Sequence, residues 1–123
     1  MPRKLAESVG YAGRGLVYAF RTQRNLKIHL AAGALAIILG VLLQVSFVEM
    51  MILVLVISSV VVLELLNTAM EEIVNLMMLT RKMRAMVAKD VAAGAVLVAA
   101  IASVVIGCYI FLPRIIVLVF RSL

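Results

Sequence analysis

The chain has 123 residues, of which 66% are hydrophobic, and its mean hydropathy is +1.21. Soluble domains are roughly 45–50% apolar, so the composition excludes an ordinary water-soluble protein and favours a single membrane domain over residues 1–123. Lysine and arginine number 12 against 6 acidic residues, which gives a formal net charge of +6. Because no nucleic-acid-binding motif is present, this charge fits anionic lipid headgroups and phosphates better than nucleic acid.

Residues 3–27 are predicted to form an amphipathic helix on the membrane surface. Apolar residues recur there at helical spacing, while the charged residues fall largely on the other side. The apolar set is Leu5, Val9, Ala12, Leu16 and Phe20. The segment lacks the cleavage pattern of a signal peptide, so we expect it to be retained.

Three transmembrane helices are predicted to follow, over about residues 29–47, 49–78 and 89–112. Each covers an apolar run close to the roughly 20 residues that a spanning helix needs. Pro113 is expected to end the third helix and to leave residues 113–123 as a tail too short to span again. The predicted fold class is therefore all-α, with three spans after a surface helix.

Basic residues are distributed unevenly around these spans. Six lie at or before Lys27 and four lie between Arg81 and Lys89, whereas the connection from Gln44 to Glu49 has none. Cytoplasmic loops carry an excess of lysine and arginine. The N-terminus and the second loop are therefore predicted to be cytoplasmic, with the C-terminus outside.

Polar side chains form a stripe along the second predicted span. Glu64, Asn67, Glu71 and Asn75 are three, four and four residues apart, so they occupy about 80° of the helix surface. At ~1.5 Å per residue from Glu49, Glu64 lies about 22 Å into a core of ~30 Å, and Glu71 lies at its cytoplasmic edge. An ionisable group inside a membrane is a functional candidate, which makes Glu64 a candidate general base. The alternative is that Glu64 and Asn67 only hydrogen-bond neighbouring helices.

A cation and an anion are predicted at the same membrane face as Glu71. Lys89 and Asp90 are expected to open the third helix. Free helix N–H groups and a lysine suit phosphate oxygens, and carboxylates at this level suit a Mg²⁺ ion that keeps several waters. The alternative is that Asp90 caps the helix while Lys89 reaches the headgroups. No P-loop or protein-kinase signature is present, so phosphoryl transfer would need another scaffold.

Three further residues receive structural interpretations. His29 is interpreted as an interfacial side chain at the start of the first span. Glu72 lies beside the stripe and is interpreted as solvated, and Cys108 is interpreted as a small core residue that forms no internal disulfide.

The motifs that carry these residues resemble a known family. E-L-L-N-T-A-M-E from Glu64 and K-D-V-A-A-G-A-V from Lys89 resemble the small prokaryotic diacylglycerol and undecaprenol kinases. A-G-R-G from Ala12 and R-N-L-K-I-H from Arg24 extend the resemblance up to about Pro113. The family implies a multi-pass protein of the bacterial inner membrane. It also implies a homotrimer whose active sites are shared between subunits and use ATP and Mg²⁺ on the cytoplasmic side.

The resemblance also implies roles for particular residues. Glu64 would be the base that faces the lipid hydroxyl, Asn67 would orient the reaction centre, and Glu71 would bind Mg²⁺ together with the nucleotide phosphates. Lys89 would contact the phosphates. The other residues implied for the nucleotide site are Asp90, Tyr11 and Gln23, the last of them at the position of a second metal ligand.

Two positions depart from the family pattern. Gln23 stands where the family usually has a glutamate, and Asn75 stands where it usually has an aspartate. A neutral amide is a weaker Mg²⁺ ligand than a carboxylate.

Taken together, the motifs predict a kinase that phosphorylates undecaprenol or diacylglycerol, with a slight preference for undecaprenol. The alternative is a weakened or inactive relative that binds nucleotide or acts as a scaffold. A transporter or channel is less favoured because the polar residues gather at one membrane face.

Overall fold

The computed structural model describes residues 2–77 and 82–122. Within these ranges the chain forms four helices and no strand, which confirms the all-α prediction. The helices are α1 (Pro2–Thr22), α2 (Arg24–Leu42), α3 (Phe47–Met77) and α4 (Lys82–Arg121).

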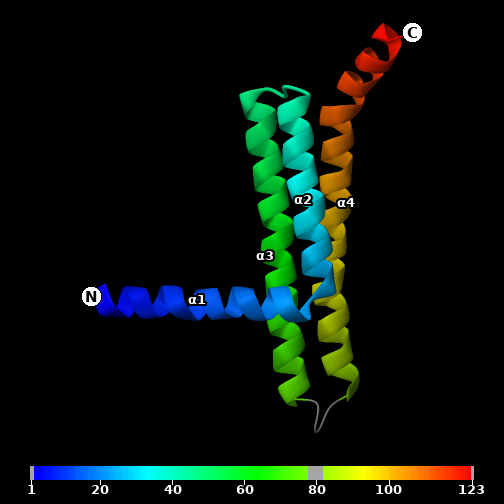
Figure 1. The fold of residues 1–123 in the computed structure, drawn as a ribbon. Coiled ribbons are helices and arrows are strands. Elements are labelled where there is room, and N and C mark those ends of the chain that lie inside the picture. The colour runs from blue at the N-terminus through cyan, green and yellow to red at the C-terminus, as the bar shows by residue number, and fades with distance from the viewer. Residues whose placement is uncertain (1, 78–81, 123) are drawn as a thin grey trace.

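Helices α2, α3 and α4 run side by side as a bundle (Figure 1). All three are long and apolar enough to cross a membrane, as predicted. Helix α3 packs against both of the others. At about 1.5 Å per residue, the 31 residues of α3 exceed the ~30 Å hydrocarbon core.

The buried core of the bundle is small and lies near the α2–α3 turn. It consists of Leu53, Ile110 and Phe111 together with partly buried neighbours from α2, the α2–α3 turn, α3 and α4. Helix α2 approaches α3 closely at Gly33, where an added Cβ would lie 2.7 Å from Cγ2 of Ile57. Most other large apolar side chains are exposed. This is the arrangement of a protein whose solvent is lipid rather than water.

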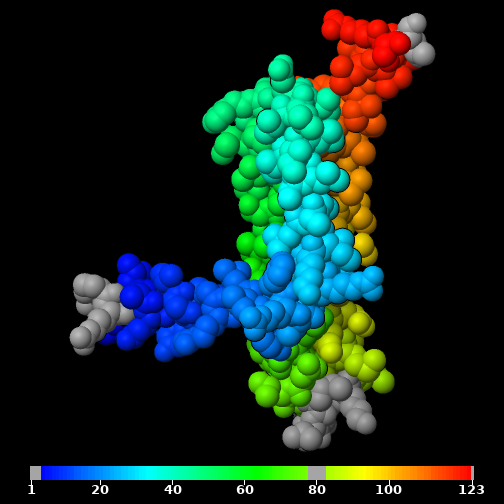
Figure 2. All heavy atoms as spheres, in the orientation of Figure 1, coloured from blue at the N-terminus to red at the C-terminus, as the bar shows by residue number. Residues whose placement is uncertain are grey.

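Helix α1 crosses the bundle instead of joining it (Figures 1 and 2). It contacts α2 and α3 through its C-terminal part, where Ala19 is buried. Its apolar side chains, among them Leu5, Val9 and Leu16, are exposed. An amphipathic helix that projects across a spanning bundle has the orientation expected at a membrane surface.

The junction between α1 and α2 differs from the prediction. Helix α1 ends at Thr22 rather than at residue 27, and α2 runs over 24–42 rather than 29–47. Gln23 interrupts the helices with an extended backbone, φ −98° and ψ 110°. No glycine or proline marks this break, so local propensity offered no signal for it.

Helix α4 is longer at both ends than predicted. It begins at Lys82, so the expectation that Lys89 and Asp90 open the helix is wrong, and their backbone N–H groups lie in the helix interior. It also continues through Pro113 to Arg121 and bends away from the bundle near its end (Figure 1). Pro113 has no N–H for the Tyr109 carbonyl four residues earlier, but spanning helices tolerate proline. The next carbonyl, that of Ile110, accepts a hydrogen bond from the Arg114 guanidinium at 2.8 Å.

Candidate functional site

The part of the polar stripe of α3 around Glu64 and Asn67 faces the inside of the bundle, whereas Asn75 at its other end is exposed. Glu64, Asn67 and Thr68 are 1%, 6% and 5% exposed, which makes them the buried polar residues among those described. Helical periodicity sets them on one face, as the spacing predicted. They lie in the middle part of α3, away from the Leu53 cluster. The bundle therefore places a carboxylate and an amide where an apolar interior would otherwise be expected.

A pocket of about 280 Å³ opens onto this stripe between α2, α3 and α4. Its polar lining comes from Asn25 and His29 of α2 and from Glu64 and Asn67 of α3. Helix α4 contributes only apolar side chains, which are Ala93, Val96, Leu97 and Ala100. A few converging polar groups in an apolar pocket are typical of a small-molecule site.

Two oxygen atoms in this pocket lack a hydrogen-bond partner. Within the described ranges, Oε1 of Glu64 and Oδ1 of Asn67 are buried and accept no hydrogen bond. Buried acceptors are usually paired, because an unpaired one loses hydration without compensation. These two oxygens are therefore the atoms of the site best suited to accept a hydrogen bond from a bound molecule.

Glu71 is held by two amide groups one turn further along the stripe. Asn67 Nδ2 donates to its Oε1 at 3.2 Å, and Gln23 Nε2 donates to its Oε2 at 3.4 Å. The break between α1 and α2 brings Gln23 to this carboxylate from 48 residues away. The structure thus brings Gln23, Asn67 and Glu71 together, and their expected roles in the site stay predictions.

Lys89 reaches the next turn of the same stripe. Its Nζ donates to Oδ1 of Asn75 at 3.4 Å, which links α4 to the C-terminal part of α3. Asp90 follows Lys89 and is exposed. A cation from α4 thus lies beside the turn that follows Glu71.

Tyr11 is not brought to this group within one chain. It is 64% exposed on α1, and the guanidinium of Arg14 lies 4.7 Å from the centroid of its ring. Its expected part in the nucleotide site stays a prediction.

The residues around Glu71 fit a Mg²⁺ ion that is held only partly by protein. Within residues 2–77 and 82–122, no three His, Cys, Asp or Glu side chains gather as a metal cluster. Glu71 supplies one carboxylate, and Asn67 and Gln23 face it with their amide N–H groups and so orient it rather than add metal ligands. Mg²⁺ commonly binds through one or two carboxylates, substrate phosphates and several waters. Such an ion suits this donor set, whereas an ion caged entirely by protein does not.

An apolar groove continues from the Glu64 pocket towards the α2–α3 turn. It has a volume of about 340 Å³ and shares His29 and Ala100 with that pocket. Small residues of α2, including Gly33, form one side, and Phe111 lies at the far end. The groove is therefore suited to an apolar chain whose polar end lies near Glu64.

The sequence interpretation of His29 as merely interfacial missed its place in the pocket. His29 and Asn25 are four residues apart and both line the pocket beside Glu64. Two polar residues on one face at the start of a span were the signal available in the sequence. Asn25 lies in the R-N-L-K-I-H motif, but the sequence alone indicated no role for it.

Two other structural interpretations are revised. Glu72 is exposed as expected, but it also accepts a 2.8 Å hydrogen bond from the Tyr18 hydroxyl, which raises the pKa of Tyr18. Cys108 is exposed on α4, so its assignment to the core is wrong. A single apolar span does not reveal which of its faces is buried.

Comparison with known proteins agrees with the motifs in this site. Residues 10–111 match the family described as prokaryotic diacylglycerol kinase. An undecaprenol kinase of Bacillus subtilis is 45% identical over 108 residues, covering 88% of this chain and 88% of that protein. A diacylglycerol kinase of Synechocystis sp. is 44% identical over 110 residues, covering 89% of this chain and 63% of that protein.

Proposed function

The chain belongs to the prokaryotic diacylglycerol kinase family and is a lipid kinase, and from that premise we propose that it transfers the γ-phosphate of ATP to the hydroxyl of a membrane lipid alcohol. The observation that carries the proposal is the buried Oε1 of Glu64, which lacks a described partner and faces a pocket open to an apolar groove. A lipid hydroxyl entering this pocket would donate its hydrogen bond to that oxygen.

Glu64 acts in this proposal as the general base. It accepts the proton of the hydroxyl as the oxygen attacks phosphorus, and the bond from phosphorus to the leaving ADP oxygen breaks in line with the attack. Asn67 lies between Glu64 and Glu71 on the same helix face and orients the acceptor through its free Oδ1. Proton and phosphoryl group thus move at one end of the pocket.

Glu71 and Lys89 provide the charges at the phosphate side. Lys89 leaves Asn75 to contact phosphate oxygens, and Glu71, oriented by two amides, would hold Mg²⁺ at the phosphate side. The ion, when bound, offsets phosphate charge. Positioning and charge neutralisation supply most of the catalysis that phosphoryl transfer needs. Asp90, beside Lys89, is proposed to support the nucleotide site.

The acceptor is proposed to be undecaprenol or diacylglycerol, with a slight preference for undecaprenol. Both present one hydroxyl at the end of apolar chains, which suits a polar pocket continuous with an apolar groove. We further propose a homotrimer with shared sites in the bacterial inner membrane, with the nucleotide on the cytoplasmic side. Within a single chain, Tyr11 lies apart from Glu71. In a site shared between subunits, Tyr11 of one subunit could contribute to the nucleotide site of another.

Reconstitution into vesicles with γ-labelled ATP, Mg²⁺ and either lipid tests the proposal. We expect labelled phospholipid from the wild-type chain and none above background from Glu64→Gln. Glu72→Gln removes a charge from the same helix, outside the pocket, and should retain activity. The proposed reaction would be refuted if neither the wild-type chain nor Gln23→Glu formed labelled phospholipid with undecaprenol or with diacylglycerol.

Gln23 also favours a second candidate, a kinase with reduced activity. Its neutral amide contacts Glu71, where a carboxylate would bind metal more strongly. Product from Gln23→Glu in the same vesicles, with none from the wild-type chain, would favour this weakened relative.

A further inference from the structure

The last residues of α4 form a feature that the proposed reaction does not use. We call Arg114–Arg121 the C-terminal arm. It follows Pro113, and the end of α4 leads away from the bundle (Figure 1). It also lies beyond residues 10–111, the part of the chain that matches the family.

The arm lies beyond what is needed to cross a membrane. From Asp90 to Pro113, α4 is about 36 Å long at ~1.5 Å per residue, which already exceeds a hydrocarbon core of ~30 Å. A straight continuation would carry the arm into water. The bend near Pro113 redirects it sideways instead.

The arm has the chemistry of a membrane interface. Its six central residues, 115–120, are all apolar, and their exposure ranges from 38% at Ile115 to 74% at Phe120. Water around this surface would be unfavourable. Arg114 and Arg121 are seven residues apart, so they lie within about 20° of each other on one edge of the helix. An apolar helix with one cationic edge is suited to lie between acyl chains and headgroups.

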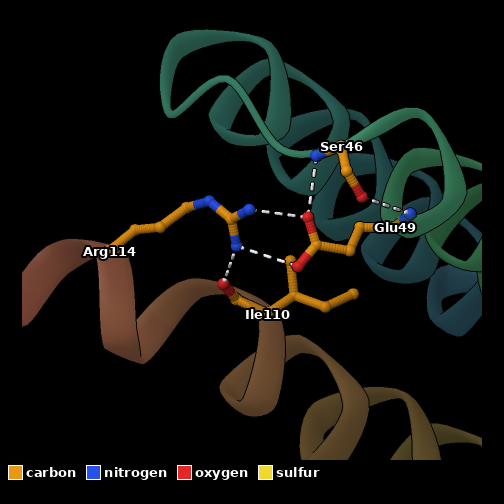
Figure 3. A network of polar contacts seen from close by, with 4 residues as sticks. All are labelled: Ser46, Glu49, Ile110 and Arg114. Carbon is orange, nitrogen blue, oxygen red and sulfur yellow. Dashed lines mark hydrogen bonds and ion pairs between the residues drawn. The ribbon is translucent and has the colours of Figure 1, made fainter.

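The start of the arm is fixed to the end of the bundle. The Arg114 guanidinium donates to both carboxylate oxygens of Glu49, at 3.0 and 2.6 Å (Figure 3). Glu49 in turn accepts from the Ser46 backbone N–H at 2.7 Å, and Ser46 Oγ accepts from the Glu49 N–H at 3.2 Å. This reciprocal pair caps α3. The first residue of the arm is thus held to the N-terminal end of α3 by the Arg114–Glu49 ion pair.

A groove of about 510 Å³ separates the arm from the α2–α3 turn. It is lined by apolar side chains, including Leu42, Leu43, Val117 and Leu118, and it has polar groups at Gln44 and Arg114. Acyl chains and a headgroup match this distribution of apolar and polar lining.

We propose that the C-terminal arm lies in the membrane interface at the end of the bundle opposite Glu71, with its apolar surface among acyl chains and Arg121 at lipid phosphates. Its partner is the phospholipid surface itself. Cationic side chains near helix ends extend to headgroups in this way. The proposal does not depend on kinase activity.

Spin labels along the arm of the full-length protein test this proposal. Cys108 is the sole cysteine, so the Cys108→Ala background accepts one new cysteine at a time, at Ile116, Leu118 or Phe120. Each labelled protein is placed in phosphatidylcholine–phosphatidylglycerol vesicles. Collision with oxygen, which partitions into lipid, is compared with collision with a water-soluble nickel chelate. The wild-type label at Cys108 is the lipid reference, and Met83→Cys at the opposite end is the water reference.

We expect the arm labels to collide with oxygen more than with nickel. Adding Pro113→Ala should straighten α4 and raise nickel collision at Leu118 and Phe120 by roughly twofold or more. Nickel collision equal to that of Met83→Cys at all three positions would place the arm in water and overturn the proposal. Low collision with both reagents, with spin–spin broadening, would place the arm against a second copy of the chain and would overturn it as well.

Discussion

Two glutamates of α3, Glu49 near its start and Glu64 in its middle, have opposite surroundings. Glu49, at the α2–α3 turn, has both carboxylate oxygens paired with Arg114 and is also joined to the Ser46 cap. Glu64 is more deeply buried, yet its Oε1 has no described partner. The same residue type therefore stabilises one end of the helix and leaves an open acceptor in the middle.

The two carboxylates therefore have different consequences for the protein: one affects its stability, and the other is available to a bound molecule. A carboxylate whose partners are all in place orders the structure but offers no free acceptor to a ligand. A buried, unpaired carboxylate destabilises the fold and is retained where it meets a substrate. The described structure therefore anchors the Glu49 end through paired charges, and it leaves at Glu64 the free acceptor on which the proposed function depends.

The largest expected effect comes from Glu64→Gln. Loss of a general base should lower turnover by roughly 10²–10⁴-fold, while the melting temperature in detergent should stay the same or rise because a buried charge is removed. Labelled-phosphate transfer and thermal denaturation measure the two quantities. A large drop in melting temperature together with lost activity would mean that Glu64 only supports the fold.

Arg114→Ala should produce the reverse pattern. Glu49 then loses both guanidinium bonds, so the melting temperature should fall by roughly 2–6 °C while phosphoryl transfer changes little. Arg121→Ala removes the same type of charge without breaking a described ion pair and is the matched control. If Arg114→Ala abolished activity at unchanged stability, the division between the two regions would be incorrect.

A smaller effect is expected from Gln23→Glu. A second carboxylate beside Glu71 should lower the Mg²⁺ concentration for half-maximal activity roughly three- to tenfold. Without Mg²⁺ the two carboxylates repel, so the melting temperature should fall and recover on Mg²⁺ addition. Asn75→Asp is the control, because Lys89 already contacts that side chain. Equal Mg²⁺ responses of the two variants would contradict a metal site centred on Glu71.

The smallest effect is expected from Tyr18→Phe. The hydrogen bond to Glu72 raises the pKa of Tyr18 above its ordinary value of 10.0. The bond therefore stabilises the docking of α1 below pH 10, and this contribution is lost as the pH rises through the higher pKa of the folded state. Protection of the α1 amides against exchange, taken relative to the base-catalysed intrinsic rate, should fall slightly in Tyr18→Phe, and the further loss of protection expected above pH 10 in the wild-type chain should be absent. The same alkaline loss of protection in Tyr18→Phe would assign it to another group.

Helix periodicity and charge placement were enough to predict the spans and the polar stripe. The spacing of Glu64, Asn67 and Glu71 specifies one helix face wherever the helix lies. The pairing of Glu49 with Arg114 was beyond reach, because 65 residues separate them and only packing brings them together. That Oε1 of Glu64 lacks a hydrogen-bond partner could not be predicted from the sequence either, because it depends on whether α2 and α4 place a donor beside it.

The errors in the helix limits have physical causes. Proline usually ends or kinks a helix in water, but a spanning helix tolerates it, and α4 continues through Pro113 to Arg121. The basic residues before Lys89 predict a loop there, yet α4 begins at Lys82. The break at Gln23 results from the change of direction between a helix across the bundle and one along it.

The length of α2 makes the position of the protein in the membrane sensitive to bilayer thickness. Its 19 residues extend about 28 Å, slightly less than a typical hydrocarbon core, and the close approach at Gly33 prevents it from sliding freely along α3. In lipids with longer tails, hydrophobic mismatch would fall on α2 first, through local thinning or loss of tilt. Acyl-chain length is therefore a physical variable to which the depth of Glu64, and with it the rate, should respond.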